Sequence, residues 1–159
     1  MAKKDQQLQA VVRMYKQATG KTVADMNDVA EYAEKTLNWR MPKPPSPRQL
    51  LAKQLSQAQR AEYKRNPRTG DPYRVNHAMV ISQGEKQLTL WMGIEDATRG
   101  QMALSVGQRR EQMVGDAYHA VVDTEAWNDL HPEDKQLSFE TDFGPDVHWR
   151  RHTPKDNAA

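Results

Sequence analysis

Basic and amide side chains recur between residues 46 and 68 with the spacing of one helical face. Ser46-Pro47 predicts the start of a helix, because serine caps helix N-termini and proline fits the first turn. We expect this helix to run to about residue 65. A helix turns about 100° per residue, so a set of polar side chains lies opposite Leu51. They are Gln49, Lys53, Ser56, Gln57, Arg60 and Lys64.

Such a face has the chemistry of nucleic-acid recognition. Lysine and arginine neutralise phosphates, and arginine and glutamine can contact base edges in a major groove. Residues 40–68 contain eight lysines and arginines and a single acid, Glu62, whereas an ordinary solvated face mixes both signs. We predict a nucleic-acid interface in which arginines position the backbone and the helix faces the groove. Its predicted residues are Arg48, Lys53, Gln57, Arg60, Lys64, Arg65, Arg68 and Lys86.

The basic stretch has alternative interpretations, because the net charge of +2 hides an asymmetry. Residues 1–92 contain 16 lysines and arginines and 8 acids, and residues 93–159 contain 7 and 13. The basic patch can be an ordinary solvated face, or it can dock the acidic half of its own chain. It can also meet an acidic surface of another protein, as in an adaptor module.

An enzyme is the less favoured interpretation. Asp116, His119 and Asp123 lie on one face of an expected helix, with Gln112, and could hold a divalent ion for phosphodiester cleavage. The same residues also fit the outer face of an acidic helix. The chain lacks GxGxxG, GxxxxGK[ST], HExxH and GxSxG. We therefore expect a non-catalytic protein, without a cofactor or a metal, whose partner is DNA or another nucleic acid.

Composition excludes some classes of site. The 159-residue chain has no cysteine, which excludes disulfides and thiolate metal sites. Its N-terminus lacks the apolar core of a secretory signal, and no apolar stretch approaches 18 residues. We expect a cytoplasmic protein that does not cross a membrane. Tryptophans and methionines at periodic positions indicate a core, although they can also form a dimer surface.

Apolar spacing predicts the elements that would position the basic residues. We expect helices over residues 5–18 and from Asp25 or Asn27 to residue 37, with Trp39 against their core. The segment RMPKPPSP predicts a stiff, extended spacer. Leu51, Leu55 and Ala58 predict the buried stripe of the third helix. YRVNHAMVIS and KQLTLWMGI predict two strands joined by a turn at SQGEK.

The acidic remainder is expected to be mainly helical. Residues 96–123 predict one helix or two, because Gly100, Gly107 and Gly115 weaken the pattern. TEAWNDLH predicts a further short helix, and LSF and DVHWR predict short strands. Residues 153–159 are expected to be disordered.

The expected order of three helices followed by a β-hairpin resembles that of winged-helix domains. The resemblance covers about 90 residues and implies nucleic-acid binding by the third helix and by the hairpin wing, where Lys86 would lie. The predicted fold is therefore α+β and mainly helical. Residues 1–93 form a basic winged-helix-like unit, and an acidic, mainly helical part with short strands, residues 94–152, packs on it. A homodimer is possible, since many helix-based readers bind paired half-sites.

Overall fold

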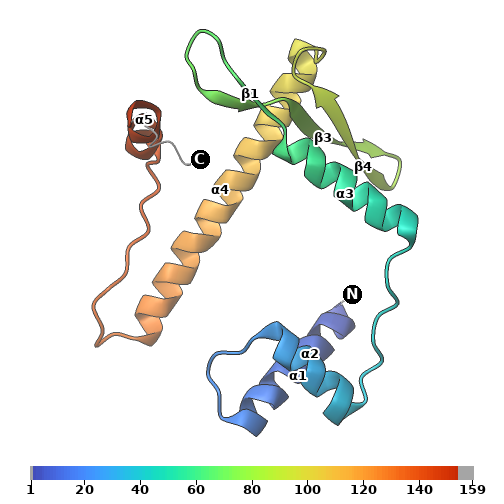
Figure 1. The fold of residues 1–159 in the computed structure, drawn as a ribbon. Helices are drawn as coiled ribbons and strands as arrows, with labels where there is room; N and C mark the ends of the chain where they lie inside the picture. The colour runs from blue at the N-terminus through green and yellow to red at the C-terminus, as the bar shows by residue number, and fades with distance from the viewer. Residues whose placement is uncertain (1, 154–159) are drawn as a thin grey trace. The chain divides into compact units, whose positions relative to one another are not determined.

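The computed structural model describes residues 2–153, and within this part the chain forms five helices and two antiparallel two-stranded sheets (Figure 1). The protein is α+β and mainly helical, as predicted. It divides into two compact units between Gln49 and Leu50, whereas the charge changes sign near residue 93. In chain order the elements are α1 (Ala2–Thr19), α2 (Met26–Leu37), α3 (Pro47–Ala61), β1 (Tyr63–Arg65), β2 (Pro72–Arg74), β3 (Asn76–Gln83), β4 (Lys86–Gly93), α4 (Arg99–Leu130) and α5 (Gly144–His152).

The first unit is a helix pair with a small core. Gly20, at φ 68°, follows the end of α1, and Asp25 caps α2 by accepting a hydrogen bond from the Asn27 backbone N–H at 2.7 Å. Trp39 packs against the core, as predicted. After this pair, residues 38–46 adopt the irregular structure expected of the proline-rich spacer. The core residues, each at most 7% exposed, are Val11, Tyr15, Val29 and Ala33.

The predicted end of the third helix is wrong. The helix ends at Ala61, and Tyr63–Arg65 forms β1, which pairs antiparallel with β2. The turn between the strands is closed by hydrogen bonds from the Gly70 N–H to the Asn66 carbonyl and from the Asn66 N–H to the Asp71 carbonyl. Pairing with residues 72–74 satisfies the backbone of residues 63–65 in place of further helical turns.

The predicted burial of the third helix is also wrong. Every residue of α3 is exposed or half-buried, and Leu51 and Leu55 are 55% and 57% exposed. The apolar stripe exists in sequence, but the described part of this chain does not cover it. The spacing correctly predicted a helix, whereas the burial that it also implied would need a partner surface.

The second hairpin agrees with its prediction. β3 pairs with β4 in register around a turn that contains Gly84 at φ 63°. Side chains of α4 cover the other edge of β3. Ser105 Oγ donates to the Ala78 carbonyl at 2.6 Å, and the Gln108 side chain bonds both the Val80 N–H and its carbonyl, at 2.9 and 2.7 Å. These bonds satisfy an edge that would otherwise be open to another strand.

Residues 99–130 form one helix in place of the two or three predicted. A capping box starts α4, in which Thr98 accepts from the Gln101 N–H while the Gln101 side chain accepts from the Thr98 N–H. The helix continues through Gly107 and Gly115 and includes TEAWNDLH. Among the described residues, no helix is long and apolar enough to cross a membrane.

The two short strands predicted near the C-terminus are wrong. LSF lies in irregular structure, and DVHWR belongs to α5, which has proline in its first turn. Because residues four apart share a helix face, the rings of His148 and His152 stack with centroids 4.2 Å apart. Apart from Thr153, the tail predicted to be disordered lies outside the described residues.

Candidate nucleic-acid interface

The eight residues predicted to bind nucleic acid are spread over three kinds of element. Arg48, Lys53, Gln57 and Arg60 lie on α3, and all four are exposed. The others lie on the two hairpins: Lys64 and Arg65 on β1, Arg68 in the β1–β2 loop and Lys86 at the start of β4. The exposed cations of α3 are therefore accessible to a partner, whereas on the first hairpin Lys64 and Arg65 contact Glu95 and the Gly70 carbonyl.

Lys64 is paired with an acid of its own chain. Its Nζ lies 2.8 Å from Glu95 Oε1, in the loop between β4 and α4. This hydrogen bond and the opposite charge raise the pKa of Lys64 above its ordinary value of 10.5 and lower that of Glu95 below 4.5. The predicted placement of Lys64 on the helix face beside Arg60 is wrong, because the helix ends before it.

Arg60 is brought into a cleft of about 330 Å³ between the end of α3, the two hairpins and α4. Its guanidinium carbon lies 5.1 Å from the centre of the Trp91 ring on β4. A cation held over an aromatic face is attracted by the ring and loses little further freedom on binding an anion. Arg60 is therefore a cation held at the cleft by a neighbouring strand.

Two more arginines line the same cleft from other elements. Arg74, on β2, donates from Nε to the Tyr63 hydroxyl at 3.0 Å, and Arg109 comes from the first half of α4. His77 lies among them and contacts the Arg74 carbonyl at 3.2 Å through Nε2.

The electrostatic character of the cleft follows from its composition. Three arginines line it, and its lining side chains, all within residues 60–112 of the described part, include no carboxylate. Three like charges around one hollow repel one another, and a bound anion relieves that repulsion. Thr89 and Gln112 complete the wall as donor side chains. The amides of Asn76 and Gln108, which also line it, already donate to Glu62 Oε2 and to the Val80 carbonyl, each at 2.7 Å. The arrangement is suited to bind a phosphate and to hydrogen-bond the groups around it.

Of the three arginines of the cleft, Arg60 is among the residues predicted from sequence, and Arg74 and Arg109 are not. Arg74 lies near the start of the predicted strand YRVNHAMVIS, and Arg109 lies in the acidic half of the chain. A usable signal was present: Ser105, Gln108, Arg109 and Gln112 follow the i, i+3, i+4, i+7 spacing of one helix face. This face packs against the edge of β3, and the local sequence pattern does not reveal that contact.

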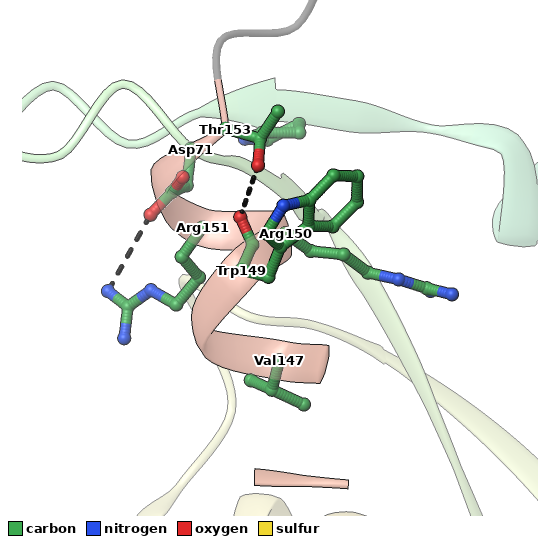
Figure 2. Close-up of a pocket in the computed structure, with 7 residues that line it drawn as sticks. Asp71, Val147, Trp149, Arg150, Arg151 and Thr153 are labelled. Carbon is green, nitrogen blue, oxygen red and sulfur yellow. Dashed lines mark hydrogen bonds and ion pairs between the residues drawn. The ribbon is translucent and has the colours of Figure 1, made fainter. Parts of the chain in front are cut away.

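A second hollow lies where α5 meets the β1–β2 hairpin (Figure 2). Arg151 lies 3.7 Å from Asp71, and the Thr153 hydroxyl donates to the Trp149 carbonyl at 2.8 Å. Asp71 offsets one of the two α5 arginines, so this hollow has less excess positive charge than the cleft. Trp149, 65% exposed, gives it an apolar wall.

The predicted metal-ligand alternative is not supported by the geometry. Among residues 2–153, no group of three or more histidine, aspartate and glutamate side chains is placed to hold one ion. Asp116, His119 and Asp123 share a face of α4 without converging on a common point.

Comparison with known proteins gives no family for this chain. No protein-family model, no curated protein and no solved structure matches it.

Proposed function

We propose that this protein binds nucleic acid without catalysis, with double-stranded DNA as its ligand, and that the cleft takes a backbone phosphate. The observation that carries the proposal is the convergence of Arg60, Arg74 and Arg109 on one hollow whose described lining has no acid. Arginine binds phosphate in a bidentate way that lysine cannot reproduce. Three arginines from three elements around one hollow favour a specifically bound phosphate over loosely associated counterions.

The exposed polar face of α3 extends the proposed interface beyond the cleft. Lys53, Gln57 and Arg60 share this face, and Arg60 reaches the cleft from its last turn. A phosphate held by the arginines would place the adjoining nucleotides beside cations and an amide of α3. Helices followed by a hairpin are also the order found in winged-helix domains, which use the third helix and the wing in this way.

Adjacent arginines on α4 provide a matched test. Arg109 lines the cleft, whereas Arg110 lines a different groove and lies 3.3 Å from Glu111. Fluorescence anisotropy with a random-sequence duplex at low salt measures binding to each variant. We expect Arg109→Ala to raise the Kd about tenfold, the effect of losing about 1.4 kcal/mol from a charge-assisted contact. Arg110→Ala should stay within about twofold of the parent protein.

Competition separates the proposal from its runner-up, an adaptor that meets an acidic protein surface. Unlabelled duplex should displace the labelled duplex at concentrations where polyglutamate of equal charge does not. Equal effects of Arg109→Ala and Arg110→Ala would remove the cleft from the interface. Stronger displacement by polyglutamate would favour the protein-binding alternative.

A further inference from the structure

Two exposed apolar surfaces of the second unit have no partner in the described chain. The first, the α3 stripe, consists of Leu51, Leu55 and Ala58, which share one helix face. The second, the α4 groove, is a hollow of about 500 Å³ between α4 and the segment before α5. Met113 and Val114 in this groove are 54% and 47% exposed. The groove is lined by Arg110, Met113, Val114, Ala117, Tyr118, Val121, Thr141 and Phe143.

The two surfaces lie on helices of opposite charge. Residues 47–61 contain three basic side chains and no acid, and residues 99–130 contain five acids and three arginines. One of these arginines, Arg110, lines the groove and lies 3.3 Å from Glu111. Helical position puts Arg48 beside the α3 stripe, 60° from Leu51 at about 100° per residue. Glu111 and Glu125 lie seven residues before and after Tyr118, hence along one edge of the groove. The net charges of the two helices, +3 for residues 47–61 and −2 for residues 99–130, are therefore of opposite sign.

Within one chain the two surfaces do not meet. The described residues that line the groove include none from α3, and the leucines of the stripe are more than half exposed. Every copy of the chain nevertheless carries one stripe and one groove. Two copies related by a two-fold axis can satisfy both surfaces of both chains at once, which closes the assembly.

We propose that the protein forms a homodimer in which the α3 stripe of each copy docks in the α4 groove of the other. Apolar surface on both sides supplies the attraction, and the charges around it select the pairing of α3 with α4 over α3 with α3. Lys53 and Arg60 lie about 180–200° from Leu51, so docking leaves them exposed for nucleic acid. The dimer would present two such faces.

The oligomeric state of the whole chain, without nucleic acid, is the first test. Light scattering coupled to size-exclusion chromatography at two protein concentrations should give a mass of twice 18.2 kDa at the higher one. Leu55→Glu should shift the protein to the monomer, because it puts a charge into the buried contact. Gln57→Glu adds the same charge on the opposite face and should leave the dimer intact. A parent protein that stays monomeric at both concentrations would overturn the proposal.

Cysteine cross-linking then tests which helices meet, because the natural chain has no cysteine. A tagged Leu55→Cys chain is mixed with an untagged Val114→Cys chain and mildly oxidised. We expect a mixed disulfide at a yield several-fold above that of the Gln57→Cys and Val114→Cys mixture. A Leu55→Cys chain that links to itself as efficiently would show α3 against α3. Equal yields from positions 55 and 57 would show chance collision, and either result would contradict the proposed pairing.

Discussion

Individual cations in this protein differ in the groups that already contact them. These contacts determine how much each cation can contribute to the binding of an anion. Lys64 donates to Glu95 at 2.8 Å, so an incoming phosphate must compete with a carboxylate. Arg60 instead lies over the Trp91 ring, which orients it without neutralising its charge. A residue's sign and exposure are therefore insufficient to predict its contribution. We expect Arg60 to contribute more to anion binding than Lys64.

The Lys64–Glu95 pair predicts a pH dependence of stability. The pKa of Glu95 is lowered in the folded protein, so its contribution is present above the ordinary value of 4.5 and is lost as the pH falls through the folded pKa. The pKa of Lys64 is raised, so that contribution is lost only as the pH rises above 10.5. Thermal unfolding should therefore show Lys64→Met slightly less stable than the parent at pH 7. The difference should shrink below pH 4.5, and a difference that persists at pH 2.5 would assign the effect to the lysine side chain's packing.

Helix α4 stabilises the β3–β4 hairpin by hydrogen bonds from its side chains to the edge of β3. A two-stranded hairpin is only marginally stable alone. Here Ser105, 7% exposed, and Gln108 bind backbone groups of β3 that would otherwise face solvent or another strand. The same contact brings Arg109 of α4 to the wall of the cleft. The edge of β3 therefore contributes both to stability and to the candidate site.

Removal of the hydrogen bond between Ser105 and the edge of β3 should measurably lower the stability of the protein. Ser105→Ala leaves the Ala78 carbonyl without its 2.6 Å donor in a mostly buried place. We expect the free energy of unfolding to fall by about 1 kcal/mol, measured by urea denaturation. Ser56→Ala on α3 is the matched control, because that hydroxyl returns to the Ala52 carbonyl of its own helix. Equal losses from both variants would mean that the edge contact adds nothing specific.

Elements with strong local signals were predictable from sequence, and those decided by distant pairing were not. Gly20, Asp25 and the apolar spacing correctly predict α1 and α2. Residues 63–65 fit a helix locally, and only their pairing with residues 72–74 makes them a strand. In residues 144–152, the alternation of Val147 and Trp149 favours a strand, whereas the proline in the first turn is a helix-start signal, and the structure has the helix α5.

The candidate site could be predicted only in part for the same reason. The charge bias of residues 40–68 identified the exposed face of α3 and Arg60. The cleft itself is assembled from a helix end, two hairpins and the first half of α4, so it depends on tertiary placement. The apolar pattern of α3 likewise predicts that Leu51 and Leu55 are covered by another surface. It does not reveal whether the covering surface belongs to the same chain.

At the scale of the molecule, the chain is two compact units joined near the proline-rich segment. Among the described residues of the first unit, the buried core consists of Val11, Tyr15, Val29 and Ala33. The second contains all three arginines of the cleft as well as both surfaces of the proposed dimer. Of the residues proposed to bind nucleic acid or to form the dimer, Arg48 alone lies before residue 50.

Limited proteolysis tests this division. Arg40 is exposed in the irregular segment 38–46, where a protease can bind extended backbone. We expect the first tryptic cut after Arg40, followed by a persistent fragment that starts at Met41, both identified by mass spectrometry. Lys43 is protected by the proline that follows it. Arg40→Gln should slow this first cut, and an earlier cut within α4 would contradict the compact second unit.

We propose that a cluster of cations on the second unit holds nucleic-acid phosphates. The most direct measurement is the salt dependence of duplex DNA binding by fluorescence anisotropy. If Arg60, Arg74 and Arg109 act with Lys53, Arg65 and Arg68, the plot of log Kobs against log salt should have a slope of about −5. The triple variant Arg60→Ala/Arg74→Ala/Arg109→Ala should make that slope less steep by about 3. Binding that is absent at low salt, or a slope that the triple variant leaves unchanged, would contradict the proposal that these cations hold phosphates.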